Sequence, residues 1–480
     1  MTTGGPKTDS RWPALIVLCA GMLMIVLDQT IVNVALPAID EDLKFGQAGL
    51  AWVVNAYLIA YGGLLLLAGR LGDLVGHKRV FLIGLGVFTA ASLLCGLSIS
   101  SEMLVVARFV QGAGGALATS VTLGMVVTMF PKPDEQRRAI GVFSFVAAAG
   151  ASIGLLLGGV LTDAMSWHWI FFVNIPIGIV AALAAVRLVP DSPGLGLREG
   201  ADVLGALLIV AAVMLGVYTI VKGEHYGFGS VHTLALGAVA VALLVAFVLR
   251  QRHATKPLLP LRVFRSRNVT GANLVQISMV AGMFGLFFLG TLYMQLVLSY
   301  TPLQIGLAFM PVAVAIAVFS VSLSARLNTR FGERNMLILG LVLMLVGMVV
   351  FTQVPVDGSY VADILPAVAP VGIGMGLAFP SLMTLAMSGA AHDEAGLASG
   401  LVNTTAQVGG ALGLAVLATT STTYTSSLLA SGVGRLEALT SGFHLAFWIS
   451  AGLVAVALAL AVFVLRQVAV SRDAQPVLVH

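Results

Sequence analysis

About fourteen apolar segments follow one another along this chain of 480 residues, and most are long enough to cross a membrane as a helix. A hydrocarbon core of roughly 30 Å needs about 20 helical residues, and a helix satisfies all of its own backbone groups there. We therefore expect an all-α polytopic membrane protein. The expected spans are 14–36, 48–68, 80–99, 103–129, 139–162, 168–188, 202–222, 232–250, 269–297, 303–325, 335–354, 363–388, 397–420 and 444–466.

The composition excludes several other classes of protein. The chain is 59% apolar and only 10% charged, far from the average of a soluble domain. Its two cysteines, Cys19 and Cys95, both lie in apolar segments, which argues against a disulfide framework or a cysteine metal site. The histidines have no metal-ligand spacing, and no phosphate-binding GxxxxGK[ST] loop is present. We therefore expect no metal, no cofactor, no use of ATP and no enzyme activity.

The basic residues predict the orientation of the spans. If the N-terminus lies in the cytoplasm, the inner segments hold 21 lysines and arginines and the outer segments hold three. This bias follows the positive-inside rule and depends on an even number of spans. We expect both termini to be cytoplasmic, in a multi-pass protein of the cytoplasmic (inner) membrane whose surroundings are the lipid bilayer.

Two loops that are eight spans apart resemble each other. Each loop has the pair Arg-Leu with a glycine five residues after the leucine. The arginine and glycine are Arg70 and Gly76 in the first loop and Arg326 and Gly332 in the second. If a unit of six spans is repeated, two spans must be inserted between the copies. Repeated bundles with a binding site at their interface are an architecture of transporters. The expected units are a six-helix bundle at 1–190, two inserted helices with linkers at 191–265, a second six-helix bundle at 266–470 and a cytoplasmic tail at 471–480.

Asp28 and Arg108 are the only charged side chains deep inside the expected spans. Counted at 1.5 Å per residue, Asp28 lies roughly 12 Å and Arg108 roughly 9 Å from the outer ends of their helices, so they share a depth. An isolated carboxylate there favours its protonated form, whereas a nearby guanidinium favours the ionised form. Motion that separates the pair would therefore let Asp28 take up a proton. The alternative is a static ion pair that braces spans 1 and 4.

Polar and aromatic side chains on several spans are candidates for the wall of a substrate cavity. Their amides could bind a substrate, but hydrogen bonds between helices explain them equally well, at about 0.6–2 kcal/mol each. The aromatic rings could stack on a flat or cationic ligand, although packing or interface anchoring is an alternative. The cavity candidates are Gln29, Asn33, Trp52, Tyr57, Gln111, Gln276, Gln295, Asn403 and Gln407.

Six motifs in order along the chain resemble the major facilitator superfamily, specifically its fourteen-span branch of drug/proton antiporters. They are LDQTIVNVALP (27–37), GRLGDLVGHKR (69–79), RFVQGAGGA (108–116), WIFFVNIPIG (169–178), YMQLVLSYTPLQIGLAFMP (293–311) and GLASGLVNTTAQVGGALG (396–413). The resemblance implies two six-helix bundles plus two extra helices. It also implies that Arg108 matches an arginine tied to proton coupling, and that no nucleic acid and no obligate protein partner is needed.

A fifth-span motif of that branch, GxxxGPxxGG, is matched with one departure. Its glycines fall at Gly150, Gly154, Gly158 and Gly159, but Leu155 stands where proline is expected. Proline would remove a backbone donor and bend the helix, so the departure puts that bend in doubt. The glycines still predict close contact between helices.

The inner-loop motif predicts a gate on the cytoplasmic side. We expect Asp73 to cap the third span and to form an ion pair with Arg137 or Arg138. Such pairs would close the inner side of the transporter in the outward-open state, as the resemblance also implies. The alternative is that these charged residues only set the orientation of the spans in the membrane. The gating candidates are Gly69, Arg70, Asp73, Gly76, Lys78, Arg79, Arg137 and Arg138.

These features together predict proton-driven efflux of small amphipathic molecules, cationic drugs or antibiotics among them, by exchange for protons and alternating access. Such a pump would confer multidrug or antibiotic resistance. The alternatives are an importer or symporter on the same fold, or an exporter dedicated to one metabolite. The serine- and threonine-rich stretch 419–427 is expected to be an outer loop, without a nucleophile.

Overall fold

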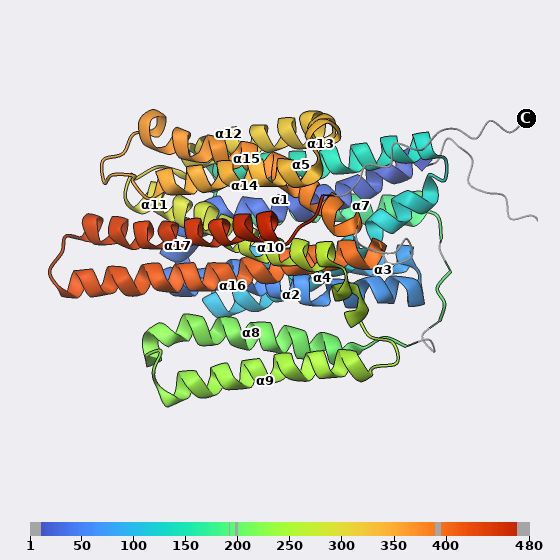
Figure 1. The fold of residues 1–480 in the computed structure, drawn as a ribbon, viewed down its shortest axis with the longest axis horizontal. Helices are drawn as coiled ribbons and strands as arrows, with labels where there is room; N and C mark the ends of the chain where they lie inside the picture. Colours follow the sequence, from blue (N-terminus) through green and yellow to red (C-terminus); the bar gives the residue numbers. More distant parts are fainter. Residues whose placement is uncertain (1–10, 192, 197–199, 389–394, 468–480) are drawn as a thin grey trace, which may run out of the picture.

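The computed structural model describes residues 11–191, 193–196, 200–388 and 395–467, and these form long helices that run side by side (Figure 1). Thirteen helices in this part of the chain are long and apolar enough to cross a membrane. Helix α5 (Pro133–Ala164), with 32 residues, occupies the place of the remaining predicted span. The predicted all-α polytopic fold is therefore confirmed.

The first six predicted spans form seven helices, because the sixth is divided at Val173 into a short turn and a longer helix. Helix α1 packs against α5 and α7, α2 packs against α4, and α3 packs against both α4 and α7. The helices are α1 (Arg11–Leu43), α2 (Gln47–Val75), α3 (His77–Gly96), α4 (Ser101–Met129), α5, α6 (Trp169–Phe172) and α7 (Asn174–Leu188).

The last six predicted spans contain three π-helical segments, where the wider turn interrupts or begins a helix. Their elements are α10 (Arg267–Phe284), η4 (Gly285–Leu289), α11 (Gly290–Leu296), α12 (Pro302–Ala317), η5 (Val318–Leu323), α13 (Ser324–Phe331), α14 (Glu333–Phe351), η6 (Tyr360–Ile364), α15 (Leu365–Ser388), α16 (Ala395–Ala430) and α17 (Arg435–Phe463). The segments η4, η5 and η6 are the π-helical ones.

The two predicted extra spans are α8 (Val203–Tyr226) and α9 (Val231–His253), which form a hairpin. In Figure 1 this green hairpin lies at one side of the molecule, and its contacts are to α2 and α16. A short 3-10 turn, η3 (Leu261–Arg265), leads from it to α10. The hairpin thus packs against one helix from each half of the chain and lies outside both bundles. The division into domains at residues 190, 265 and 470 stays a prediction.

The two similar loops adopt the same backbone conformation. Gly76 ends α2 and begins α3 with φ of 106°, and Gly332 ends α13 and begins α14 with φ of 83°. Positive φ is readily adopted only by glycine. Because Gly76 itself occupies the position that caps α3, no side chain caps this helix, and the predicted cap by Asp73 is wrong.

Small residues bring α5 against its neighbours. A Cβ atom at Gly154 or Gly158 would collide with the backbone of α1 at Leu27 or Ile31. One at Gly159 would collide with Pro302, at the start of α12.

Two further glycines extend these contacts. Gly150 faces Leu23 and Val26 of α1, and Gly306 of α12 lies against the carbonyl oxygen of Leu155. Helix α5 continues through Leu155 as one helix, and this face holds the two halves of the chain together at the predicted outer side.

The stretch 419–427 is part of α16, so its prediction as an outer loop is wrong. Some of its hydroxyl groups bond back to their own helix: Thr420 Oγ1 donates to the Val416 carbonyl at 2.7 Å and Thr422 Oγ1 to the Ala418 carbonyl at 2.9 Å. A serine- or threonine-rich segment can therefore remain helical when its hydroxyls bond back by one turn. Helices α16 and α17 form the long red and orange hairpin of Figure 1.

Candidate functional site

The two charges that the sequence places at one depth are in contact. Arg108 Nη1 of α4 lies 2.6 Å from Asp28 Oδ2 of α1, and the two side chains are 1% and 0% exposed. Two charges so fully removed from water are stable only when they are paired and when their remaining polar atoms are hydrogen-bonded.

Three neutral side chains complete the surroundings of Asp28. Gln111 Nε2 and Asn174 Nδ2 donate to Asp28 Oδ1 at 2.8 and 2.9 Å. Ser92 Oγ lies between the same two amides, accepting from Gln111 Nε2 at 2.8 Å and from Asn174 Nδ2 at 3.5 Å. The carboxylate thus accepts from one guanidinium and two amides, drawn from α4 and α7.

Asn174 and Ser92 were not among the candidates drawn from the sequence. Asn174 stands inside the WIFFVNIPIG motif, where an amide in an apolar span could have marked it. Ser92 offered no signal, because a serine in a span commonly bonds to its own helix, as Ser92 also does to the Phe88 carbonyl at 2.8 Å.

Arg108 is held through its Nε and Nη1 atoms and through the flat face of its guanidinium. Its Nε donates to the Val53 carbonyl of α2 at 3.0 Å, and its Nη1 also donates to Gln111 Oε1 at 2.6 Å. The guanidinium carbon lies 4.4 Å from the centre of the Tyr57 ring. Only arginine combines a forked set of donors with a flat face that stacks on an aromatic ring.

This arrangement requires α2 and α4 to approach closely. A Cβ atom at Gly112, in the RFVQGAGGA motif, would collide with the backbone of Tyr57. The glycine therefore lets the helices come near enough for Arg108 to reach Val53 and Tyr57 together.

A central cavity of about 400 Å³ lies between the two halves of the chain, beside this network. Six of the nine cavity candidates line it, and Arg108 lines it as well, whereas Trp52, Gln111 and Gln295 do not. The polar lining residues are Gln29, Thr30, Asn33, Tyr57, Arg108, Gln276, Asn403 and Gln407.

The rest of the cavity wall is apolar and was not singled out from the sequence. Its larger side chains are Met283, Phe284, Phe287, Met375, Phe379 and Met383. Phe287 belongs to the π-helical segment η4, and Phe284 directly precedes it. A cavity of this size, apolar with a few convergent polar groups, is typical of a small-molecule site.

Asp28 does not line the cavity, although its partner does. The carboxylate is enclosed by Arg108, Gln111 and Asn174, so within the described residues the guanidinium is the charged group that touches both the carboxylate and the cavity. A change in the charge of Asp28 would therefore reach the cavity through Arg108.

The inner-loop motif makes local contacts in this structure. Asp73 lies 3.9 Å from Arg70 and 3.6 Å from His77, while Lys78 lies 3.0 Å from Asp191, in the linker after α7. The backbone N–H of Leu195 in the same linker donates to the Asp73 carbonyl at 2.9 Å.

The other gating candidates are placed more simply. Gly69 approaches Ser120 of α4, and Arg79 and Arg138 are exposed. The side chain of Arg137 lies outside what the structure describes. The bridge from Asp73 to Arg137 or Arg138, which was expected in an outward-open state, stays a prediction.

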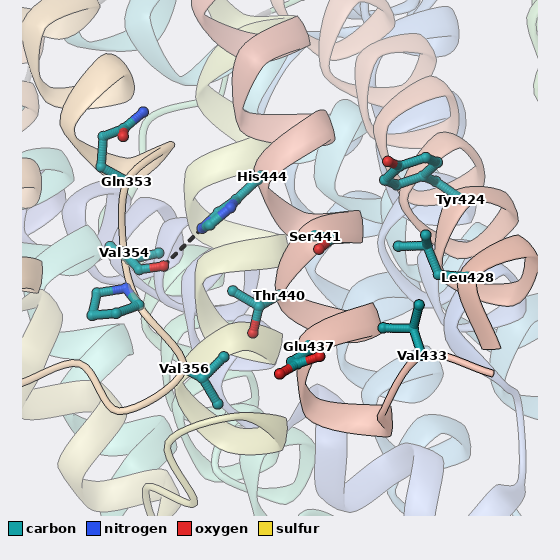
Figure 2. A pocket seen from close by; sticks show the side chains of 11 residues that line it. Gln353, Val354, Val356, Tyr424, Leu428, Val433, Glu437, Thr440, Ser441 and His444 are labelled. Carbon is teal, nitrogen blue, oxygen red and sulfur yellow. Dashed lines mark hydrogen bonds between the residues drawn. The ribbon is translucent and has the colours of Figure 1, made fainter. Parts of the chain in front are cut away.

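A second cavity, of about 440 Å³, lies at the predicted outer side between α16, α17 and the segment after α14 (Figure 2). His444 Nε2 lies 2.7 Å from the Val354 carbonyl across it, and Glu437 and Tyr424 also line it. Its described lining residues are all different from those of the central cavity. Among the described residues, neither cavity nor any other place holds three His, Cys, Asp or Glu side chains that could bind a metal.

Comparison with known proteins points to one family. Residues 18–414 match the sequence model of the Major Facilitator Superfamily. The chain is 38% identical over 422 residues to the puromycin resistance protein pur8 of Streptomyces alboniger, covering 88% of this chain and 84% of that protein. It is 36% identical over 477 residues to the cephamycin export protein CmcT of Amycolatopsis lactamdurans, covering 99% of this chain and 96% of that protein.

Solved structures similar to this chain support its fold, and they support the fold alone because their sequences are less than 20% identical to it. An auto-inhibited peptide transporter of the POT family superposes with a TM-score of 0.67 at 17% identity, covering 96% of this chain and 99% of that chain. A bacterial homologue of the human lysosomal transporter Spinster, in an inward-facing and unoccupied conformation, superposes with a TM-score of 0.64 at 16% identity, covering 95% of this chain and 97% of that chain.

Proposed function

This chain belongs to the major facilitator superfamily, and we propose that it exports small amphipathic molecules, antibiotics among them, across the cytoplasmic membrane in exchange for protons. As a multi-pass transporter of the cell membrane it is not an enzyme. Relatives that cover most of its length are named for antibiotic resistance or export, which supports efflux.

The observation that carries the proton-coupling part is the position of Arg108. This residue bonds to the enclosed carboxylate of Asp28 and also forms part of the cavity wall. A transporter needs two binding events that affect each other, and here one side chain touches both places.

The proposed cycle follows from the charges. With Asp28 ionised, Arg108 is compensated and held against Tyr57, and the cavity takes substrate from the cytoplasm. A proton that reaches Asp28 from the outer side neutralises the carboxylate, so that the guanidinium loses its ionic partner. Arg108 then shifts, the cavity wall with Tyr57 changes, and substrate leaves to the outside. Loss of the proton to the cytoplasm restores the ion pair.

The remaining parts of the proposal concern the frame of the cycle. Both termini lie in the cytoplasm, the contact of α5 with α12 closes the outer side in this conformation, and the motif around Asp73 closes the inner side in the opposite one. The glycines of α5 support the first contact because they allow the backbones to touch.

Inside-out vesicles from a host that lacks its own drug pumps test this function. The lumen is acidified by respiration, and puromycin, the antibiotic named for one relative, is added outside. We expect the addition to raise the luminal pH, because substrate enters the lumen as protons leave. The same addition to vesicles with Asp28→Asn should leave the pH unchanged. No alkalinisation with puromycin or with a wider antibiotic panel would refute export by exchange, and acidification would indicate symport.

A further inference from the structure

The described lining of the central cavity contains no acid. Among these residues the one charged side chain is Arg108, and its charge is compensated by Asp28 behind it. Cationic drugs are among the substrates expected from the sequence, but the one acid deep in the expected spans, Asp28, is enclosed by three donors. This lining therefore offers no counter-ion to a cationic ligand.

A permanently charged cation would meet an unfavourable environment here. Removing a cation from water costs free energy that a paired anion must offset, and an apolar wall with neutral amides does not supply one. The ring of Tyr57, which could otherwise attract a cation, already carries the Arg108 guanidinium on its face. Arg108 would also repel a second positive charge.

Two amides that line the cavity carry buried acceptors without a partner in the described structure. Asn33 Oδ1 and Gln276 Oε1 have no hydrogen-bond partner among the described residues, and the two side chains are 6% and 3% exposed. The orientation of the Asn33 amide is fixed because its Nδ2 donates to the carbonyls of Gln29 and Thr30, at 3.2 and 3.4 Å. A buried acceptor without a donor is costly, so a ligand that brings N–H or O–H groups gains affinity at both.

The walls between these amides suit a flat ring system. Phe284, Phe287 and Phe379 supply aromatic faces, and Met283, Met375 and Met383 supply adaptable thioethers. Asn33 lies on α1 and Gln276 on α10, so the two acceptors come from opposite halves of the chain.

We propose that the central cavity selects uncharged aromatic molecules that carry hydrogen-bond donors, received by Asn33 and Gln276, and that it discriminates against permanent cations. This inference rests on the proposed function, since it takes the cavity to be the transport site. It replaces cationic drugs by neutral, donor-bearing aromatics as the substrate class.

Equilibrium binding to the purified full-length chain in lipid nanodiscs tests the selection with three anthraquinones of one ring system. The first is diaminoanthraquinone, uncharged with N–H donors; the second is its fully N-methylated analogue, uncharged without donors; the third carries a trimethylammonium group. We expect the diamino compound to bind best, the methylated analogue about 10-fold more weakly, as expected for two lost hydrogen bonds, and the cation more weakly still.

Variants locate the binding. Asn33→Leu and Gln276→Leu should each weaken the diamino compound about 3- to 10-fold and leave the methylated analogue unchanged, which also shows that the variants are folded. Gln295→Leu is the matched control, because Gln295 Oε1 is likewise buried without a partner in the described structure but does not line the cavity. Gln276→Glu should raise the affinity for the trimethylammonium compound by supplying the missing acid.

Three outcomes would overturn the inference. The diamino compound does not bind, or Gln295→Leu weakens its binding as much as Asn33→Leu and Gln276→Leu do. The third is that a chain carrying Glu437→Gln binds the trimethylammonium compound as tightly as the diamino compound. The Glu437→Gln change removes the carboxylate of the outer cavity, so cation binding that disappears with it belongs to the outer site and supports the inference. Because the assay has no proton gradient, failure of proton coupling would leave these affinities unchanged and is seen only in the vesicle experiment.

Discussion

Replacing Arg108 by methionine removes the positive charge of the buried pair and keeps a side chain of comparable length. The Asp28 carboxylate would retain the amides of Gln111 and Asn174, at 2.8 and 2.9 Å, but it would lose its cationic partner at 2.6 Å. Both charged side chains are almost completely removed from water. Breaking a buried pair from one side costs about 3–5 kcal/mol, and we expect this loss in the free energy of unfolding for Arg108→Met. Asp28→Asn should cost a similar amount, because it strands the guanidinium.

The double variant gives the decisive comparison. It contains neither charge, so we expect it to be more stable than either single variant, with an interaction free energy of about 3 kcal/mol or more. Unfolding in mixed detergent micelles, followed by tryptophan fluorescence, measures all four corners of the cycle. Losses that simply add in the double variant would refute the conclusion that the two charges compensate each other.

Two further changes test the helix contacts. Gly306→Val should reduce transport by the reconstituted protein, because the Cβ atom of the new side chain would press on the Leu155 carbonyl where α12 meets α5. The control Gly452→Ala should not reduce transport, because the space around Gly452 is open. Equal transport by the two variants would count against this contact. Asp202→Ala should lower the free energy of unfolding by about 1–2 kcal/mol, because Asp202 caps α8 by accepting from the Gly205 N–H at 3.0 Å. Burial alone would raise the pKa of Asp202, but its hydrogen bonds outweigh burial and hold that pKa below its usual range. Its contribution is therefore complete above about pH 4 and is lost as the pH falls through the lower pKa of the folded state. A stability difference between the unmodified chain and Asp202→Ala that grew in acid would contradict the assignment.

The spans could be predicted because length and apolar composition alone decide which segments cross a bilayer. The pairing of Asp28 with Arg108 followed from counting helical residues to a common depth, which needs no knowledge of packing. The resemblance of the two loops is also visible in the sequence, and the structure adds that Gly76 and Gly332 share a positive φ.

Orientation around each helix axis could not be predicted. Most spans are apolar on all sides, so periodicity does not tell which face meets the cavity and which meets a neighbour or lipid. For this reason the sequence could not tell that Gln29 and Gln276 line the cavity while Trp52 and Gln295 do not, although all four were candidates. The enclosure of Asp28 depends on Asn174, which becomes meaningful only when α1, α4 and α7 are brought together. Ser92 of α3 accepts from the same asparagine amide.

The central claim is that Asp28 is the group that couples substrate movement to protons. Proteoliposomes with the purified chain carrying Asp28→Asn test this claim, because an asparagine at this position cannot take up or release a proton. The variant should fail to accumulate substrate when a pH gradient is imposed, whereas the unmodified chain accumulates it. Retention of full gradient-driven accumulation by Asp28→Asn would contradict the account.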